Sequence, residues 1–227
     1  MSIARYRKVC VDATDPEPIG RFWAAALGRR WQPADHGEGG VFGVTPRQTV
    51  WINLVPEVKT VKNRVHFDIY ARSLADLREL GATVVLPEGD DRRWTVMADP
   101  EGNEFCAFLR EELPEDRLHG LVVDSADPAA IAAWWAEVYD APVKHEAGGS
   151  TVENVPDMPI LTFDFAPVPE PKTVKNRVHW DITVRDVEQL VARGATVLTP
   201  AGDDRNWTVL ADPEGNEFCA FTDVRDR

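Results

Sequence analysis

Apolar and polar side chains alternate from residue 64 to residue 69, a period of two that is typical of a β-strand with one buried face. One face holds three apolar side chains: Val65, Phe67 and Ile69. The other face holds a cation, an imidazole and a carboxylate: Arg64, His66 and Asp68. The apolar face predicts a helix packed on it, and the polar face either meets solvent or lines a cavity.

The same strand occurs a second time further along the chain. Residues 172–182 repeat residues 59–69 with one change in eleven positions, so the second polar face holds Arg177, His179 and Asp181. Residues 207–221 likewise repeat residues 94–108, and the same spacing separates both pairs. This constant spacing indicates a tandem duplication in which each copy is one folding unit.

A helical period appears near the start of each copy. In the first copy five apolar side chains form one stripe: Ile19, Phe22, Trp23, Ala26 and Leu27. Asp15 is expected to cap this helix and Gly28 to end it. Short strand patterns follow, and the order then restarts at the His66 strand with a helix capped by Ser73. Each copy therefore reads as two β-α-β-β-β modules.

The chain thus contains four such modules. We place the first domain at residues 1–110 and the second at residues 117–227, with the charged segment 109–118 as the linker. A copy of about 110 residues is large enough to bury its own core.

Composition narrows the classes of partner. A formal net charge of −13 argues against nucleic acids and anionic membranes, because phosphate binding needs clustered cations. No run of about 18 apolar residues is present, so no membrane span is predicted. The three cysteines do not suggest a disulfide framework, and the N-terminus lacks the apolar region of a secretion signal. A cytoplasmic location is the expectation.

A histidine and an aspartate two residues apart share each polar face. His66 and His179 carry imidazoles that suit a general base or a ligand near neutral pH. Asp68 and Asp181 could orient the ring or take a proton themselves. The alternative is a buried polar network that holds each strand to its neighbours.

Two arginines precede these pairs on the same faces. Arg64 and Arg177 suit bidentate binding of a carboxylate or another anion. The alternative is an ion pair with a nearby acidic residue of this acid-rich chain.

Further candidates lie in the second repeated stretch. Cys106 and Cys219 are reactive only if their surroundings lower the thiol pKa, and otherwise they are small buried side chains. Trp94 and Trp207 lie on strands whose inward face the sequence does not assign. If they point into a cavity, they offer flat surfaces to an aromatic ligand.

Four modules in this order, with Lys-x-x-Lys-Asn-Arg-x-His-x-Asp and Asp-Pro-Glu-Gly-Asn-Glu-Phe-Cys, resemble the vicinal oxygen chelate superfamily. It includes glyoxalase I, extradiol dioxygenases and bleomycin-resistance proteins, and the motifs look like its glyoxalase-like domain group. The resemblance implies an α+β fold of two tandem vicinal oxygen chelate domains, each of two modules forming an open, cup-shaped sheet. In this superfamily modules often pair between subunits. The duplication could therefore supply that pairing within one chain as a pseudo-twofold dimer, and a further homodimer is possible.

The resemblance also implies where a metal would bind. Metal-using members usually take four ligands from four strands: His or Gln, Glu, His and Glu. Only the third maps here, onto His66 and His179, while Cys106 and Cys219 stand at the fourth position. We therefore expect no metal cofactor, although a divalent ion remains possible with this incomplete set.

Two other positions bear on that metal site. The first ligand position falls near Lys8 and Gly120, and His119 lies one residue away, on the opposite strand face unless a bulge intervenes. A soft site built from His66, Cys106 and Cys10 is conceivable.

The resemblance leaves two classes of function open. One is a small-molecule binding protein, like the bleomycin-resistance branch, which holds an organic, aromatic or anionic compound in the cup without a metal. The other is an enzyme, a lyase or isomerase of glyoxalase type, with His66 or His179 as the base or as a metal ligand.

Overall fold

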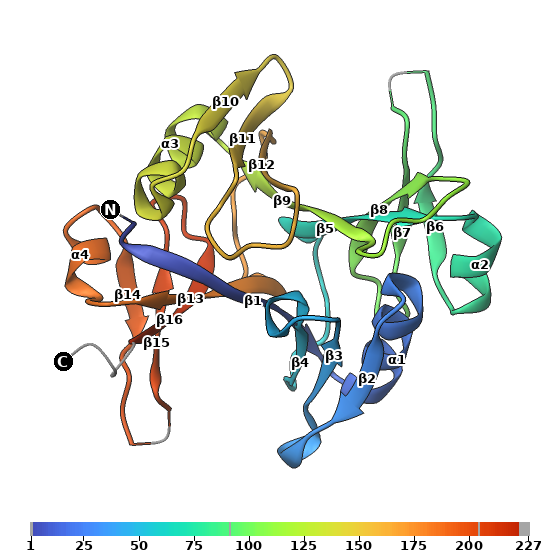
Figure 1. Cartoon of the computed structure of the whole chain (residues 1–227), viewed down its shortest axis with the longest axis horizontal. Coiled ribbons are helices and arrows are strands. Elements are labelled where there is room, and N and C mark those ends of the chain that lie inside the picture. The colour runs from blue at the N-terminus through green and yellow to red at the C-terminus, as the bar shows by residue number, and fades with distance from the viewer. Residues whose placement is uncertain (1, 91, 204, 223–227) are drawn as a thin grey trace.

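The computed structural model describes residues 2–90, 92–203 and 205–222, and its elements follow the four predicted modules (Figure 1). The first module contains β1 (Ala4–Ala13), α1 (Pro16–Leu27), β2 (Arg30–Pro33), β3 (Gly39–Phe42) and β4 (Val50–Leu54), with short 3-10 helices at Asp35–Gly37 and Pro46–Gln48. The second contains β5 (Val65–Ala71), α2 (Leu74–Glu79), β6 (Thr83–Leu86), β7 (Thr95–Ala98) and β8 (Glu104–Leu109). The third contains β9 (Leu118–Ser125), α3 (Pro128–Tyr139), β10 (Val143–Glu146), β11 (Gly149–Glu153) and β12 (Thr162–Pro167). The fourth contains β13 (Val178–Val184), α4 (Glu188–Val191), β14 (Thr196–Thr199), β15 (Trp207–Ala211) and β16 (Glu217–Thr222).

The modules pair across the two halves of the chain. One eight-stranded sheet has the order β14-β15-β16-β13-β1-β4-β3-β2 and joins the first module to the fourth. The other has the order β10-β11-β12-β9-β5-β8-β7-β6 and joins the second module to the third. The α+β class and the open sheets agree with the prediction. Each sheet takes one module from each half, which is the pseudo-twofold arrangement considered above. The two modules of one copy do not share a sheet, so the expectation that each copy forms its own cup is wrong.

The contact between modules is an antiparallel strand pair in both sheets. β1 pairs with β13 and β5 pairs with β9, near the centre of the molecule in Figure 1. Each observed sheet therefore needs strands from both halves of the chain. We call this arrangement strand exchange between the halves.

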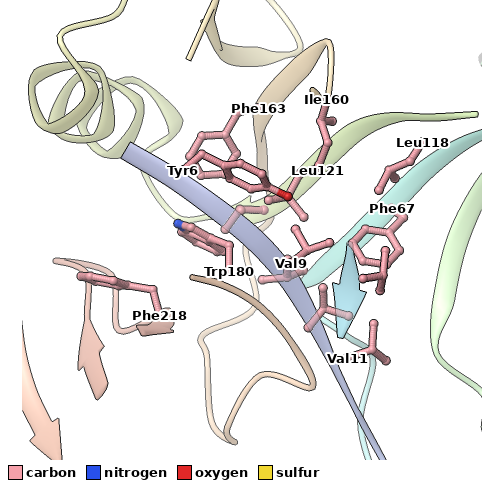
Figure 2. Packing of buried hydrophobic residues seen from close by; sticks show 14 of the residues in the cluster. Tyr6, Val9, Val11, Phe67, Leu118, Leu121, Ile160, Phe163, Trp180 and Phe218 are labelled. Atoms are coloured by element: carbon pink, nitrogen blue, oxygen red, sulfur yellow. The ribbon is translucent and has the colours of Figure 1, made fainter. Parts of the chain in front are cut away.

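The two long helices fasten the sheets together on their apolar faces. α1 packs on β2, β3 and β4, and its Trp23 also meets Phe67 of β5 edge-on, with ring centroids 5.2 Å apart. α3 packs on β10, β11 and β12, and its Trp135 meets Trp180 of β13 at 5.1 Å. Figure 2 shows the buried side chains of the central strands packed together, Phe67 and Trp180 among them. Burial of these aromatic rings holds each helix against both sheets.

Two helix starts differ in how they are capped. Asp127 accepts a hydrogen bond from Ala130 N, as expected of a cap. Asp15 occupies the corresponding position but makes no capping hydrogen bond with its side chain. Glu101 accepts hydrogen bonds from the backbone N–H groups of Thr14 and Asp15, and Glu214 accepts them from those of Ala126 and Asp127. A carboxylate from another module therefore stabilises both helix starts, and only the side-chain cap differs.

The fourth helix is shorter than its repeat. α4 spans only Glu188–Val191, whereas we expected a helix between Asp186 and Gly194 like the one that Ser73 caps in the second module. Val187 and Val191 replace Leu74 and Arg78, and β-branched side chains lower helix propensity. No helix among the described residues is long and apolar enough to cross a membrane.

The neighbouring Trp134 and Trp135 provide a matched test of the packing. Trp135 is fully buried against both sheets, whereas Trp134 is half-buried and donates its indole N–H to the Arg193 carbonyl oxygen. We expect Trp135→Ala to lower the free energy of unfolding by about 3–5 kcal/mol and Trp134→Ala by less than about 2 kcal/mol. Urea denaturation of both variants measures the difference, and equal losses would contradict a helix shared between the sheets.

Candidate functional site

The polar face of each repeated strand points away from the helices, as predicted. Val65, Phe67 and Ile69 are at most 1% exposed on the core side. His66 and Asp68 lie on the other side, with side chains 15% exposed. We call the face of the sheet that carries His66 the His66 cup, and the face of the other sheet that carries His179 the His179 cup.

Each cup gathers a histidine, an aspartate and a cysteine. In the His66 cup, donor atoms of His66, Asp68 and Cys106 all lie within 4.8 Å of one another. In the His179 cup, Cys10, His179 and Asp181 form the corresponding cluster, and the Cys219 thiol also hydrogen-bonds to Asp181. Cys10 thus lies in the other sheet from His66, because β1 pairs with β13. The soft site of His66, Cys106 and Cys10 considered above is therefore wrong.

The carboxylate of the His179 cup is fully partnered. Asp181 Oδ2 lies 3.1 Å from Lys8 Nζ, and Asp181 Oδ1 accepts a hydrogen bond from Cys10 Sγ at 3.6 Å. The Lys8 ammonium also lies 5.4 Å from the ring centroid of Trp51 and 5.6 Å from that of Phe221. An ammonium group is thus held by one carboxylate and two aromatic rings, a favourable arrangement for a cation.

The His66 cup lacks that ammonium. Gly120 lies opposite Asp68 where Lys8 lies opposite Asp181, and Asp164 takes the strand position of Trp51. A Cβ atom on Gly120 would lie 2.9 Å from Asp68 Cβ, so a side chain cannot be added there without displacement.

Within the part of the chain that the structure describes, no lysine or arginine consequently forms an ion pair with Asp68. Its Oδ1 atom is buried without a hydrogen-bond partner and lies 3.7 Å from His66 Nε2. Burial raises the pKa of Asp68 to about 7, against the smaller opposing effect of the hydrogen bond from the Cys106 thiol. The charge of the cup aspartate is therefore balanced by Lys8 in the His179 cup and, among the described residues, by no lysine or arginine at Asp68 in the His66 cup.

An aromatic wall stands beside each cluster. Trp94 stacks on Phe108 with ring centroids 5.4 Å apart, and Trp207 stacks on Phe221 at 5.5 Å. All four side chains are partly exposed. Phe108 lies beside Tyr70 on the pair β5–β8, so these rings border the cup.

A β-bulge adds one more ring to the His66 cup. The register of β5 against β9 shifts between Asp68 and Ile69, and this shift passes over His119. His119 then stacks on Tyr70 with ring centroids 4.0 Å apart. The sequence indicates only that His119 would reach this face if a bulge were present. It does not predict the bulge, because the register shift depends on which strand pairs with β9.

The titratable groups of the His66 cup favour the uncharged state. Burial lowers the pKa of His66 to about 4, so its imidazole is neutral at pH 7. Burial, with the neighbouring aspartate, raises the thiol pKa of Cys106 and of Cys219. These thiols are protonated and are poor nucleophiles unless a metal binds.

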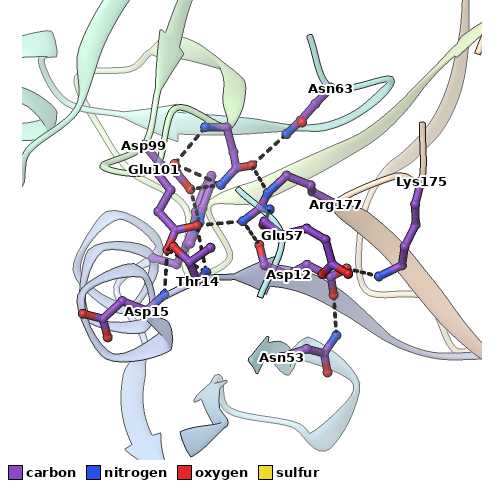
Figure 3. A network of polar contacts seen from close by, with 12 residues as sticks. Asp12, Thr14, Asp15, Asn53, Glu57, Asn63, Asp99, Glu101, Lys175 and Arg177 are labelled. Atoms are coloured by element: carbon purple, nitrogen blue, oxygen red, sulfur yellow. Dashed lines mark hydrogen bonds and ion pairs between the residues drawn. The ribbon is translucent and has the colours of Figure 1, made fainter. Parts of the chain in front are cut away.

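The two arginines lie apart from the clusters. Arg177 donates to the carbonyl oxygens of Asp12 and Glu57 at 2.8 and 2.6 Å, and its Nη2 atom lies 2.7 Å from Glu101 Oε2 (Figure 3). Arg64 donates to the carbonyl oxygens of Glu170 and Asp124. Both guanidinium groups therefore join the two halves of the chain near the cups.

The donor set of the His66 cup fits a divalent ion in kind. His66, Asp68 and Cys106 supply nitrogen, oxygen and sulfur, and three protein ligands with one open position are typical of catalytic zinc. Ligands around zinc lie roughly 3.5 Å apart, so these side chains would need to move closer together. In the His179 cup the Lys8 ammonium opposes a second cation at Asp181.

The raised pKa of Asp68 predicts a pH-dependent stability. The Asp68 carboxyl group ionises at a lower pH in the unfolded chain than in the folded protein. The free energy of unfolding therefore falls as the pH rises from about 4 to about 7. We expect Asp68→Asn to gain about 2–4 kcal/mol in unfolding free energy relative to the unmodified protein between pH 4.5 and 7.5. Urea denaturation at several pH values measures this difference.

Asp181→Asn is the matched control. It leaves Lys8 without its carboxylate, so this variant should be less stable than the unmodified protein at pH 7.5. A pH-independent difference for Asp68→Asn would contradict an uncompensated carboxyl group in the His66 cup.

Comparison with known proteins agrees with this architecture. The family described as "Glyoxalase-like domain" matches residues 8–108 and again residues 120–221. Glyoxalase I from Zea mays has a similar structure, with a TM-score of 0.67 at 12% identity, covering 96% of this chain and 92% of that one.

Two further solved structures share the fold. A putative dioxygenase from Bacillus subtilis has a TM-score of 0.65 at 15% identity, covering 98% of this chain and 86% of that one. The cppA protein from Streptococcus pneumoniae has a TM-score of 0.53 at 11% identity, covering 98% and 99%. No curated protein matches the sequence. The two family matches span most of the chain, which therefore belongs to the glyoxalase-like domain family.

Proposed function

We propose that the two cups bind small planar organic molecules without a metal, and that the His66 cup takes one with a positively charged nitrogen. The observation that carries this proposal is the position of Lys8 in the His179 cup. Its ammonium occupies the space between a carboxylate and two aromatic rings. The His66 cup keeps the carboxylate and an aromatic wall, and its cation, Arg110, lies over the Tyr70 ring at 5.0 Å; within the described residues no lysine or arginine forms an ion pair with Asp68.

Charge favours a cationic group at Asp68. The Oδ1 atom has no hydrogen-bond partner, and the His66 imidazole 3.7 Å away is neutral at pH 7 because burial lowers its pKa to about 4. An ionised carboxylate is costly to bury without a charge partner. A protonated amine or amidine would donate to Asp68 and lie against the ring of Phe108, because His119 and the Arg110 guanidinium already contact the Tyr70 ring. A cation over an aromatic face contributes roughly 0.5–2 kcal/mol beyond its other contacts.

The aromatic wall favours a flat ligand body. Trp94 and Phe108 are already stacked and partly exposed, so a further ring can stack without displacing a core residue. In the His179 cup the wall of Trp207 and Phe221 remains, with the Arg7 guanidinium 4.3 Å from the Phe221 ring centroid, and Lys8 already neutralises Asp181. That cup is suited to a neutral or anionic planar molecule.

A second candidate is a metal-dependent lyase or isomerase in the His66 cup. It is favoured by the convergence of His66, Asp68 and Cys106 within 4.8 Å. These three side chains would hold the ion, and a bound divalent ion supplies Lewis-acid polarisation of a substrate oxygen. Without an ion, the neutral imidazole of His66 could still accept a proton from a bound molecule.

Three isosteric probes test the charge preference: benzamidine is cationic, benzamide is neutral and benzoate is anionic. Titration calorimetry at pH 7.5 should give one benzamidine site per chain, at least tenfold tighter than for benzamide or benzoate at that site. Asp68→Asn should remove this preference. Lys8→Gly should raise the number of benzamidine sites to two, because it exposes Asp181 and its rings.

Equal binding of the three probes in the His66 cup would contradict the proposal. A zinc titration of the same samples separates the second candidate. Tight binding of zinc that Cys106→Ser and His66→Ala abolish, with no specific binding of benzamidine, would favour the metal-dependent enzyme.

A further inference from the structure

A cavity of about 590 Å³ lies between the two halves of the chain, outside both cups. Its walls are the segments that link β4 to β5 and β12 to β13, which cross between the sheets (Figure 1). Both segments end in the repeated Lys-Asn-Arg sequence, so the cavity lies on the pseudo-twofold axis. The histidines, cysteines and tryptophans of the cups do not line it.

The walls are largely apolar. Val61 and Val174 are equivalent residues of the two segments, and both line the cavity although they are 42% and 43% exposed. Val58 is 69% exposed at the same place, and Val55 and Val168 add to the walls. Valine side chains this exposed gain by contact with an apolar occupant.

The two arginines of the cavity differ in their charge partners. Arg177 pairs with Glu101 at 2.7 Å. Arg64 is the equivalent residue, yet its hydrogen bonds go only to the backbone carbonyl oxygens of Glu170 and Asp124. Within the described residues no carboxylate lies within ion-pair distance of Arg64. Two of its five N–H donors are used, so the group can still bind an anion.

The reason lies in how the two equivalent glutamates are engaged. Glu101 accepts from Thr14 and Asp15 and also pairs with Arg177. Glu214 accepts from Ser125 and Asp127 in the same manner, but among the described residues it forms no hydrogen bond or ion pair with Arg64. The charge of Arg177 is therefore balanced by Glu101, whereas the charge of Arg64 is not balanced by Glu214.

A second cation stands beside Arg64. The Lys62 side chain is 60% exposed, and its ammonium pairs with the carboxylate of Asp124, which is 4% exposed. A carboxylate placed between Arg64 and Lys62 would face these two cations and the Asp124 carboxylate. Glu57 and Glu170 also line the cavity, so an occupant with a single negative charge is favoured over one with two.

We infer that this cavity is a third binding site, which takes a small monocarboxylate with an aliphatic body. Its carboxylate accepts two hydrogen bonds from Arg64, the geometry that guanidinium groups favour. Its aliphatic body lies along Val61 and Val174. The volume is within the roughly 300–1,000 Å³ range of small-molecule sites.

Octanoate is the probe, with 1-octylamine as the charge-reversed control and 1-octanol as the neutral one. Titration calorimetry should show one octanoate site per chain and at least tenfold weaker binding of both controls. Arg64→Gln should weaken octanoate binding at least tenfold while leaving the benzamidine affinity unchanged. Asp68→Asn, which alters the His66 cup, should leave octanoate binding unchanged.

A second variant, Val61→Asp, tests the cavity even if Arg64→Gln does not fold. It places a carboxylate on an exposed wall position and should abolish octanoate binding while the thermal unfolding temperature is retained. The inference is overturned if octanoate does not bind the unmodified protein or binds Val61→Asp equally well. It is also overturned if a folded Arg64→Gln binds octanoate with unchanged affinity, or if Phe108→Leu removes binding and thereby places octanoate in the His66 cup.

Discussion

The antiparallel pairing of β1 with β13, and of β5 with β9, is the interaction on which the rest of the structure depends. These pairs join strands from opposite halves of the chain and complete the backbone hydrogen bonds that would otherwise remain open at a sheet edge. They also decide which side chains meet. Cys10 lies opposite His179, and Lys8 lies opposite Asp181, because β1 runs beside β13 and not beside β5. The buried aromatic rings of α1 and α3 then hold both sheets to the same helices.

The exchange of strands explains why near-identical motifs carry different chemistry. Duplication gave both cups a histidine, an aspartate and a cysteine in the same places on β5 and β8 or on β13 and β16. The strand that completes each cup comes from a less similar part of the repeat. It brings Lys8 to one cup and Gly120 to the other, while Asp164 takes the position of Trp51, and these differences set the charge around the aspartate. A glutamate outside the cups diverges in the same way, since Glu101 pairs with Arg177 and Glu214 leaves Arg64 to carbonyl oxygens.

Local patterns in the sequence predict the elements and the faces of the strands. Alternation assigns Phe67 to the core and His66 to the cup, because a strand exposes successive side chains on opposite sides. The modules, and the repeat that relates them, follow from the same kind of pattern. Non-local features do not follow. The partner of β1, the bulge at His119 and the reach of Glu101 to Arg177 each depend on contacts between distant segments, and the cavity between the halves exists only once those segments are in place.

The most direct test of the strand exchange is a disulfide across β1 and β13. Arg5 lies opposite Thr183 in this pair, and Cα atoms of opposed residues in antiparallel strands are close enough for a disulfide. Tyr70 is the residue of β5 that corresponds to Thr183, so it would face Arg5 if each half closed its own sheet. Mass spectrometry of peptides from the non-reduced protein should find a 5–183 disulfide in Arg5→Cys/Thr183→Cys and no 5–70 disulfide in Arg5→Cys/Tyr70→Cys. A 5–70 disulfide without a 5–183 disulfide would contradict the exchange and, with it, the account of both cups.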